Sequence, residues 1–275
     1  MDKQIVMRDE FINNTKRYCL WLADITPSEL RALPQVLRRV EQVKSMRPKS
    51  IRQSTRDLAN KPTLFGEPRQ PKSHYLASPR ASSENRRFIP IAFLSSNVIA
   101  GDKVYTIENA NIYEFGVMAS TMHMAWMRTT AGRMKSDNNY TNQITYSNFP
   151  WPTRNLVISS LTPNISNNTA ILNQVQHDKH HVAIEARAQA VLGARSIHAN
   201  ASLADLYDPL ILPANFLKAH QALDKAVDAA YGYKGAMSDA ARVAFLFERY
   251  QQITSLLPSL TNIKTRPKKM LKESK

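Results

Sequence analysis

Three polar residues at alternate positions, Lys135, Asp137 and Asn139, carry side chains suited to reading the polar edges of a partner. Successive side chains of an extended strand point to opposite faces, so these three are predicted to share one face. A lysine donates hydrogen bonds, a carboxylate accepts them and a carboxamide does both. Base edges in the DNA major groove are distinguished by such donors and acceptors. A solvated polar hairpin is the alternative interpretation.

An apolar pattern before this strip predicts the helix that supports it. Hydrophobic residues recur at helical spacing in a run that breaks at Gly132. These residues are Ile112, Phe115, Met118, Met122 and Trp126. We expect Met122, Met124 and Trp126 to pack in the core, and we expect His123 among them to bind no ligand.

The composition favours a partner that carries negative charge. The 275 residues include 37 Lys and Arg against 22 Asp and Glu, a formal charge of +15. Nucleic acid is therefore favoured over a membrane surface. Residues 151–263 are nearly neutral, so the DNA-facing surface is expected in the first 150 residues and in the basic C-terminal tail.

The same composition argues against several other classes of protein. A single cysteine, Cys19, excludes an internal disulfide framework and a cysteine-based zinc site, which suits a cytoplasmic protein. No apolar run approaches the 18 or so residues of a membrane span, so no membrane partner is expected.

The first sixty residues predict a strand and a basic helix. Arg17–Ile25 has the aromatic and branched residues of a buried strand. Thr26-Pro27-Ser28-Glu29 is a helix start signal, and Pro34 should kink the helix or delay its start. Basic residues follow over about 25 positions, where they either track phosphates or form a solvated face. They are Arg31, Arg38, Arg39, Lys44, Arg47, Lys49, Arg52 and Arg56.

Three short strands are predicted next, at Tyr75–Ala77, Arg87–Leu94 and Lys103–Ile107. Pro90 limits the second strand to a sheet edge or a bulge. The loop from Pro79 to Arg87 contains three arginines among hydroxyl and amide groups, a mixture typical of phosphate binding and also of an ordinary surface loop.

After Pro152 the sequence becomes helical. The predicted helices are Val182–Arg195, Pro213–Tyr231 and Ser238–Leu256, with Gly232 as a C-terminal cap and Ser238 as an N-cap. The nearby His177, His180 and His181 are not expected to form a functional zinc site.

These patterns predict an α+β protein: a mixed α/β domain with short strands and a supporting helix, followed by a small all-α domain. The expected division is residues 1–153 for the first domain and 154–180 for a linker or insertion. Residues 181–257 would form the helical domain and 258–275 a basic tail.

Several long blocks, in this order, resemble one family of proteins. They are RYCLWLADI, TLFGEPRQP, PRASSENRRFIPIAFL, NIYEFGVMASTMHMAWMRTTAGRMKSD, YSNFPWP, SLADLYDPLILP, ALDKAVDAAYGYKG and SDAARVAFLFERYQQITS. Together they resemble the target-recognition domain and C-terminal helical domain of the MmeI-like (type IIL) restriction–modification proteins. The resemblance covers nearly the whole chain.

This resemblance implies part of an S-adenosylmethionine-dependent adenine-N6 DNA methyltransferase, often joined to a nuclease. The chain is expected to start after the catalytic part, because it contains no glycine-rich cofactor loop and no Asn/Asp/Ser-Pro-Pro-aromatic tetrapeptide. Asn148-Phe149-Pro150-Trp151 has phenylalanine where that tetrapeptide needs its first proline. No catalytic residue, metal or cofactor is therefore assigned to the chain. Double-stranded DNA is the expected partner, with a separate methyltransferase chain as a candidate second partner.

The resemblance also assigns roles to individual residues. Lys135 and Asp137 would act on one base pair, because a lysine donates to guanine O6 and N7 while an aspartate accepts from cytosine N4. A Glu-x-Arg pair at these positions would favour the reverse orientation. Asn139 would act on a neighbouring pair, together with Lys103. The phosphate-binding candidates are Arg80, Arg86, Arg87, Arg128 and Arg133.

Two other functions fit the composition. The chain could be an enzyme with its own active site, in which case it would bind S-adenosylmethionine unaided. Alternatively it could be a sequence-neutral nucleic-acid binder or an inactive gene fragment, which would show no preferred site in competition binding.

Overall fold

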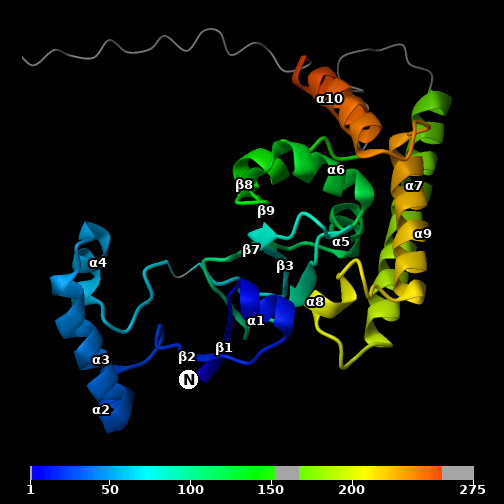
Figure 1. Ribbon diagram of the computed structural model, residues 1–275. Coiled ribbons are helices and arrows are strands. Elements are labelled where there is room, and N and C mark those ends of the chain that lie inside the picture. Colours follow the sequence, from blue (N-terminus) through cyan, green and yellow to red (C-terminus); the bar gives the residue numbers. More distant parts are fainter. Residues whose placement is uncertain (1, 68, 153–166, 256–275) are drawn as a thin grey trace, which may run out of the picture.

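The computed structural model describes residues 2–67, 69–152 and 167–255 (Figure 1). The N-terminal half of the chain forms three three-stranded sheets, and long helices follow them in sequence. The predicted α+β class is therefore confirmed. Among the described helices, none is long and apolar enough to cross a membrane.

The first sheet is built around the N-terminal strand. Strand β1 (Asp2–Val6) pairs antiparallel with β2 (Tyr18–Leu20) and parallel with β6 (Ile99–Ala100). The prediction of a buried strand over Arg17–Ile25 is wrong, because only the three residues of β2 pair. Strand β2 lies at the sheet edge, where one face stays in solvent, and Tyr18 is 61% exposed.

The second sheet contains the three strands predicted from residues 75–107. Its order is β5 (Ala92–Leu94), β3 (Tyr75–Pro79) and β7 (Val104–Glu108), all antiparallel. Strand β3 lies in the centre and is buried throughout. Strand β5 is an edge strand that starts only after Pro90, as expected for a residue without an amide hydrogen.

A helical arm projects from the body beside β1 and β2 (Figure 1). It consists of α2 (Pro27–Arg31), α3 (Pro34–Met46) and α4 (Gln53–Asp57), with 3₁₀ turns at Arg47–Lys49 and Leu58–Asn60. Thr26 caps α2 as predicted: its Oγ1 accepts from the Glu29 amide at 3.3 Å, and its own amide donates to the Glu29 carboxylate at 2.8 Å. Pro34 starts a second helix, so the delayed start is the outcome observed.

The predicted supporting helix is in fact two helices, α5 (Ile112–Met118) and α6 (Thr121–Thr130). The helix is interrupted at Ala119 and Ser120, because Ser120 caps α6 with its side chain and its own backbone is extended rather than helical. Met122, Met124 and Trp126 are at most 2% exposed, so their assignment to the core is confirmed.

The C-terminal part consists of helices α7 (Asn167–Ser196), α8 (Leu203–Leu206), α9 (Ala214–Tyr231) and α10 (Asp239–Ser255). Gly232 ends α9 with a φ of +66°, and the Ser238 hydroxyl accepts from the Ala241 amide at 3.3 Å, so both predicted caps are confirmed. Helix α7 includes residues 167–180, which were predicted to be linker. Extending an existing helix adds one hydrogen bond per residue fixed, so even polar residues can lengthen it. The rest of that linker and the predicted tail lie outside the described residues.

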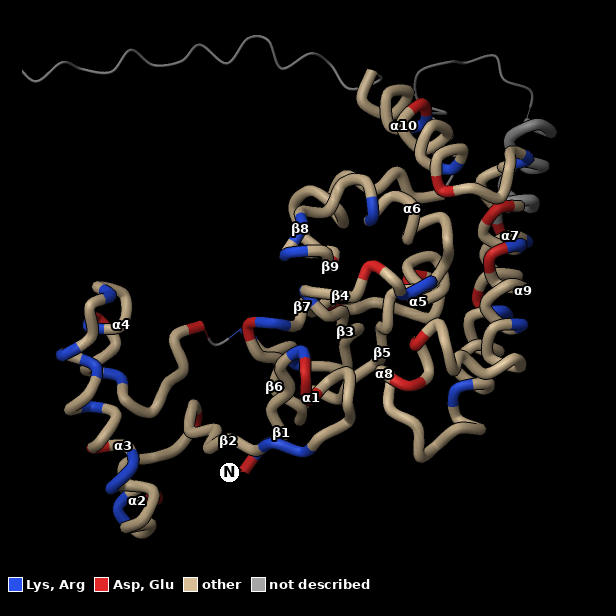
Figure 2. The backbone as a smooth tube through the Cα atoms, in the orientation of Figure 1, with Lys and Arg blue, Asp and Glu red and all other residues tan. Residues whose placement is uncertain are grey.

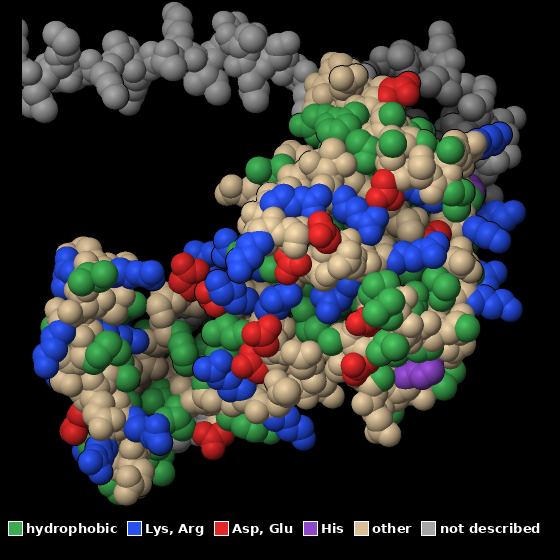
Figure 3. Space-filling view, in the orientation of Figure 1, with side chains coloured by type: hydrophobic (Ala, Val, Ile, Leu, Met, Phe, Trp, Pro, Cys, Tyr) green, Lys and Arg blue, Asp and Glu red, His purple; other side chains and the backbone are tan. Residues whose placement is uncertain are grey.

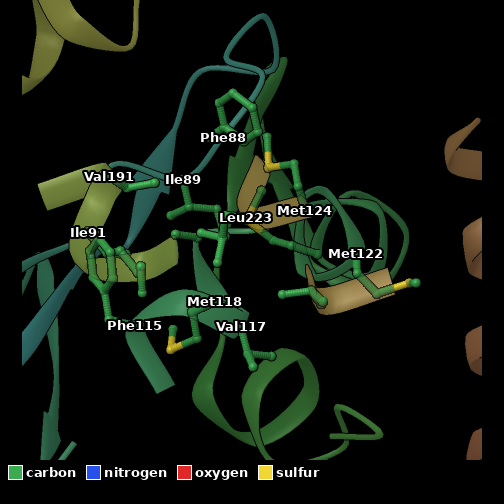
Figure 4. Close-up of a cluster of buried hydrophobic side chains, with 14 of the residues drawn as sticks. Phe88, Ile89, Ile91, Phe115, Val117, Met118, Met122, Met124, Val191 and Leu223 are labelled. Carbon is green, nitrogen blue, oxygen red and sulfur yellow. The ribbon is translucent and has the colours of Figure 1, made fainter. Parts of the chain in front are cut away.

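The C-terminal helices and the preceding part share one hydrophobic core (Figure 4). Phe115 and Met122 from the first part pack in the same cluster as Val191 and Leu223 from α7 and α9. At Gly116, an added Cβ would lie 2.8 Å from Ile184 Cγ2. The helical part is thus packed against α5 and α6 as one continuous interior.

Candidate nucleic-acid interface

A β-hairpin carries the predicted base-reading residues. Strands β8 (Gly132–Met134) and β9 (Asp137–Asn139) pair antiparallel and are joined by a two-residue turn at Lys135 and Ser136. Lys135 adopts a φ of +58°. The prediction of one extended strip is therefore wrong, because a tight hairpin turn requires a positive φ at its first central residue. Alternation along a strand applies only to Asp137 and Asn139.

A third strand joins this hairpin to the other candidates. Strand β4 (Ala81–Ser82) pairs with β9 so that Ala81 faces Asn139. Next to it, the Arg80 carbonyl accepts from the Tyr140 amide at 2.7 Å, and the Arg80 amide donates to the Lys103 carbonyl at 2.9 Å. The structure thus brings Lys103, Arg80 and Asn139 together on adjacent segments, although they are far apart in sequence.

The hairpin is anchored to the core at its base. Tyr140 is 2% exposed, and its hydroxyl lies 3.1 Å from Nε2 of His123 on α6. Burial lowers the pKa of His123 to about 3, so this imidazole is neutral at ordinary pH. The tip has no such burial: Lys135 and Ser136 are exposed, and Asp137 and Asn139 are half-buried. A fixed base with an open tip is the arrangement needed to present side chains to a partner.

Asp137 pairs with an arginine that no sequence pattern predicted. Nη2 of Arg8, at the start of α1 (Arg8–Asn13), lies 3.4 Å from Asp137 Oδ2, and Arg8 Nε donates to the Ala81 carbonyl at 3.0 Å. Helix α1 itself was not predicted. No local pattern in the sequence links position 8 to position 137.

The predicted phosphate contacts differ in their surroundings. Arg86 lies close to Arg8 and Asp137; burial, and after it the charge of Arg8, lower the pKa of its guanidinium. Arg87 is exposed, with its guanidinium 5.6 Å from the ring centre of Phe88.

Two further candidates make protein contacts with their guanidinium groups. Arg133 donates to the Ser136 carbonyl at 3.1 Å and so braces the hairpin turn. Arg128 donates to Asp239 on α10 and, at 2.8 Å, to the carbonyl of Arg86. The contacts of Arg128 tie α6 to α10 and to the loop after β4.

Basic side chains gather around this hairpin on the molecular surface. Lys and Arg cover much of the face that carries β8 and β9, with acidic side chains interspersed (Figure 3). The backbone view shows further Lys and Arg along the helical arm (Figure 2). Such a distribution matches the electrostatic footprint of a nucleic-acid-binding surface.

The histidines and glycines are the residues that bear on a metal site or a cofactor loop. In the part of the chain that the structure describes, no group of three or more His, Cys, Asp or Glu side chains is placed to hold a metal ion. His181, from the predicted histidine cluster, stacks on Tyr113 with ring centres 4.2 Å apart. The resemblance implies S-adenosylmethionine for the full enzyme, but the described glycines do not fit it. None of them lies between a strand and a helix that follows it, as a cofactor loop requires: Gly101 lies between β6 and β7, and Gly116 inside α5.

Comparisons with known proteins agree with this architecture. The sequence profile described as "MmeI, target recognition domain" matches residues 2–153, and the one described as "MmeI, C-terminal domain" matches residues 175–258. The chain is 31% identical over 252 residues to DNA methyltransferase A of Bacillus subtilis (strain 168), an alignment that covers 92% of this chain and 26% of that protein.

A solved structure is similar over the same span. It is the type IIL restriction–modification enzyme MmeI in complex with DNA, with 45% sequence identity and a TM-score of 0.82. The match covers 93% of this chain and 31% of the MmeI chain. The fold and the profiles together define a target recognition domain with its C-terminal helical partner. The chain belongs to the MmeI family of restriction–modification proteins.

Proposed function

We propose that this chain is the sequence-reading module of an adenine-N6 DNA methyltransferase in a restriction–modification system. The observation that carries the proposal is the anchored hairpin, which holds Lys135 in its exposed turn, two positions before Asp137 at the start of β9. A non-glycine residue in the left-handed region is uncommon, and such residues concentrate at functional sites. The DNA-bound MmeI structure supports double-stranded DNA as the partner.

Lys135 and Asp137 select one orientation of a G·C pair. The ammonium group donates to guanine O6 and N7, and the carboxylate accepts from cytosine N4 on the same pair. Asn139 contacts a neighbouring pair, with Lys103 approaching from the adjacent segment. Arg80, Arg86, Arg87 and Arg133 lie around this hairpin and contact phosphates, which set the register of the complex.

Methyl transfer belongs to the part of the family protein that this chain does not align with. The chain spans about a quarter of the B. subtilis relative and about a third of MmeI. S-adenosylmethionine and the reacting adenine would be bound by a catalytic methyltransferase part, in the same polypeptide or in a separate chain. The residues here position that part over one DNA sequence.

Selection from a randomised duplex pool tests this function. We expect the chain to enrich one sequence, and we expect Lys135→Glu with Asp137→Arg to exchange one G·C requirement for C·G while other positions stay unchanged. Each well-made base contact is worth about 1–3 kcal/mol of discrimination. The matched control is Lys225→Glu with Glu248→Arg, two exposed positions on α9 and α10 with the same charge changes.

The outcomes separate the candidate functions when the salt concentration is held constant. Enrichment of one sequence, reoriented by the hairpin pair and unaltered by the control, supports base reading. Equal binding to all duplexes would identify a sequence-neutral binder and overturn the proposal. Enrichment that the hairpin pair leaves unaltered would remove the assignment of Lys135 and Asp137.

A further inference from the structure

Arg8 bridges two of the three strands that form the hairpin sheet. Its guanidinium donates to the carbonyl of Ala81 on β4 at 3.0 Å and lies 3.4 Å from the carboxylate of Asp137 on β9. Both charged side chains are about one-third exposed, at 34% for Arg8 and 33% for Asp137. The ion pair therefore lies at the open face of the sheet, beside the exposed tip.

The two carboxylate oxygens of Asp137 have different surroundings. Arg8 contacts Oδ2, while Oδ1 accepts no hydrogen bond from any residue that the structure describes. A carboxylate can accept from an arginine and from a second donor at the same time, because its two oxygens offer about four lone-pair sites. Oδ1 is thus available to a base amino group while Oδ2 fixes the direction of the side chain.

We propose that Arg8 is a positioning residue for base reading, and hence a third specificity-determining position for the base pair that Lys135 and Asp137 contact. This inference rests on the proposed function. Arg8 holds the Asp137 carboxylate in the orientation that a cytosine amino group requires. Its second bond, to Ala81, fixes the guanidinium to the sheet, so the carboxylate is aligned before DNA arrives.

The charges around this pair have a consequence for changing specificity. The guanidinium of Arg8 lies 3.4 Å from the Asp137 carboxylate and 3.8 Å from that of Asp9, and the charges of Arg8 and Asp137 both act on Arg86. Asp137→Arg would remove the carboxylate that Arg8 contacts and place a second guanidinium beside that of Arg8. Like charges in contact repel. The exchanged pair at positions 135 and 137 should therefore bind its new duplex more tightly when position 8 is changed as well.

A double-mutant cycle on DNA discrimination tests the positioning role. The measured quantity is the ratio of dissociation constants between the duplex that the wild-type chain selects and the duplex with the Asp137-contacted base pair inverted. We expect Arg8→Ala to lower this ratio by roughly 5- to 150-fold, the range that corresponds to one base contact. In an Asp137→Ala background, Arg8→Ala should have no further effect on the ratio. Arg8→Lys should restore part of it, because lysine keeps the charge without the fork that reaches both partners.

Arg17→Ala is the matched control, because Arg17 also pairs with α1, through Glu10 at 3.1 Å, but lies on the β2 side of the molecule. It should leave the ratio unchanged. Equal weakening of both duplexes by Arg8→Ala would identify a phosphate contact and overturn the proposal. Independent, additive effects of Arg8→Ala and Asp137→Ala would do the same.

The same variants separate this inference from the proposed function. If the wild-type chain enriches no sequence, the proposed function fails, and the role of Arg8 in base reading fails with it. A double-mutant cycle measured by chemical unfolding still gives the coupling free energy between Arg8 and Asp137. If the wild-type chain enriches a sequence, two combined variants decide the matter. Lys135→Glu with Asp137→Arg should bind its new duplex more weakly than the version that also carries Arg8→Glu. Equal affinity of the two versions would contradict a role for position 8 in specificity.

Discussion

Asp224 is a buried carboxyl group that caps α6 from a neighbouring helix. It is 4% exposed, and its Oδ1 accepts from the amide of Thr121, the first residue of α6, at 2.7 Å. Burial raises the pKa of Asp224 from 3.8 to about 6, and the hydrogen bond from Thr121 opposes that rise. This carboxyl therefore holds its proton more strongly in the folded chain than in the unfolded chain.

We expect Asp224→Asn to stabilise the protein in a pH-dependent way. Because the folded pKa is raised, ionisation destabilises the fold progressively as pH rises from 3.8 to about 6, and the effect is complete above that range. The amide of asparagine can still accept from Thr121 but carries no charge. The gain should reach about 3 kcal/mol at pH 8, at 1.36 kcal/mol per pKa unit, and should shrink towards pH 4.

Chemical unfolding of both proteins at pH 5 and pH 8 measures this difference. Asp205→Asn serves as a control, because Asp205 is an exposed cap whose pKa is lowered by hydrogen bonds from Ser202. A gain at Asp224 that is identical at the two pH values would contradict the burial argument.

For single residues, the sequence predicted burial better than backbone conformation. Periodicity correctly placed Met122 and Trp126 in the core, because burial follows from helical spacing. The left-handed turn at Lys135 was missed, because it depends on the pairing of Met134 with Asp137. Arg8 was missed altogether, because its partner lies 129 positions further along the chain.

Helices α5 and α7 approach each other closely at a glycine. A Cβ at Gly116 would lie 2.8 Å from Ile184 and 3.0 Å from Ala188, so α7 leaves no room for a side chain there. Gly193, also in α7, is exposed and would place its Cβ in open space. The two glycines therefore have opposite expected responses to alanine.

We expect Gly116→Ala to destabilise the fold by about 1–3 kcal/mol, as overpacking of a tight interior does. Gly193→Ala should stabilise it by about 0.5–1 kcal/mol, because alanine loses less backbone entropy in a helix. Denaturant midpoints of the two variants against the wild type give both values. If both variants are destabilised, or if neither is, the close approach of α5 and α7 does not explain the effect of alanine at position 116.

Elements with strong end signals were predicted well from sequence. Thr26, Gly232 and Ser238 cap helices as their residue types indicate. The break at Ser120 was missed because the apolar pattern continues through the residue that caps α6, and the length of α7 was missed because its first residues have no periodic pattern. Short edge strands such as β2 gave no reliable signal, since only one of their faces packs.

The helical arm contributes little to the buried core of the described residues. Within α2, α3 and α4, only Val40 is buried, whereas Arg38 and Arg39 are exposed on α3. Arginines in this position either bind phosphates or remain solvated. Dependence of DNA affinity on salt distinguishes these cases, because each phosphate that an arginine neutralises releases counterions.

We expect Arg38→Gln with Arg39→Gln to weaken binding to all duplexes alike and to reduce the salt slope by about 1 for each phosphate that the variant no longer neutralises. Fluorescence anisotropy across a salt series measures this slope. Lys225→Gln, an exposed change on α9, is the control. An unchanged slope in the arm variant would show that these arginines are only solvated.

The two parts of the molecule were predicted as separate domains, yet their interiors are continuous. Beyond the packing at Gly116, the hydroxyl of Tyr231 on α9 donates to the carbonyl of Pro150 at 2.9 Å. Sequence patterns show which face of a helix is apolar but not which other element covers it.

This continuity bears on how specificities can be exchanged between relatives. A graft that ends near Pro152 would place foreign side chains against α7 and α9, and we expect this mismatch to lower the stability of the chimera. A graft limited to the hairpin tip and Arg8 crosses no buried boundary. Under the proposed function, recognition can therefore change through a few surface substitutions while the interior is inherited intact.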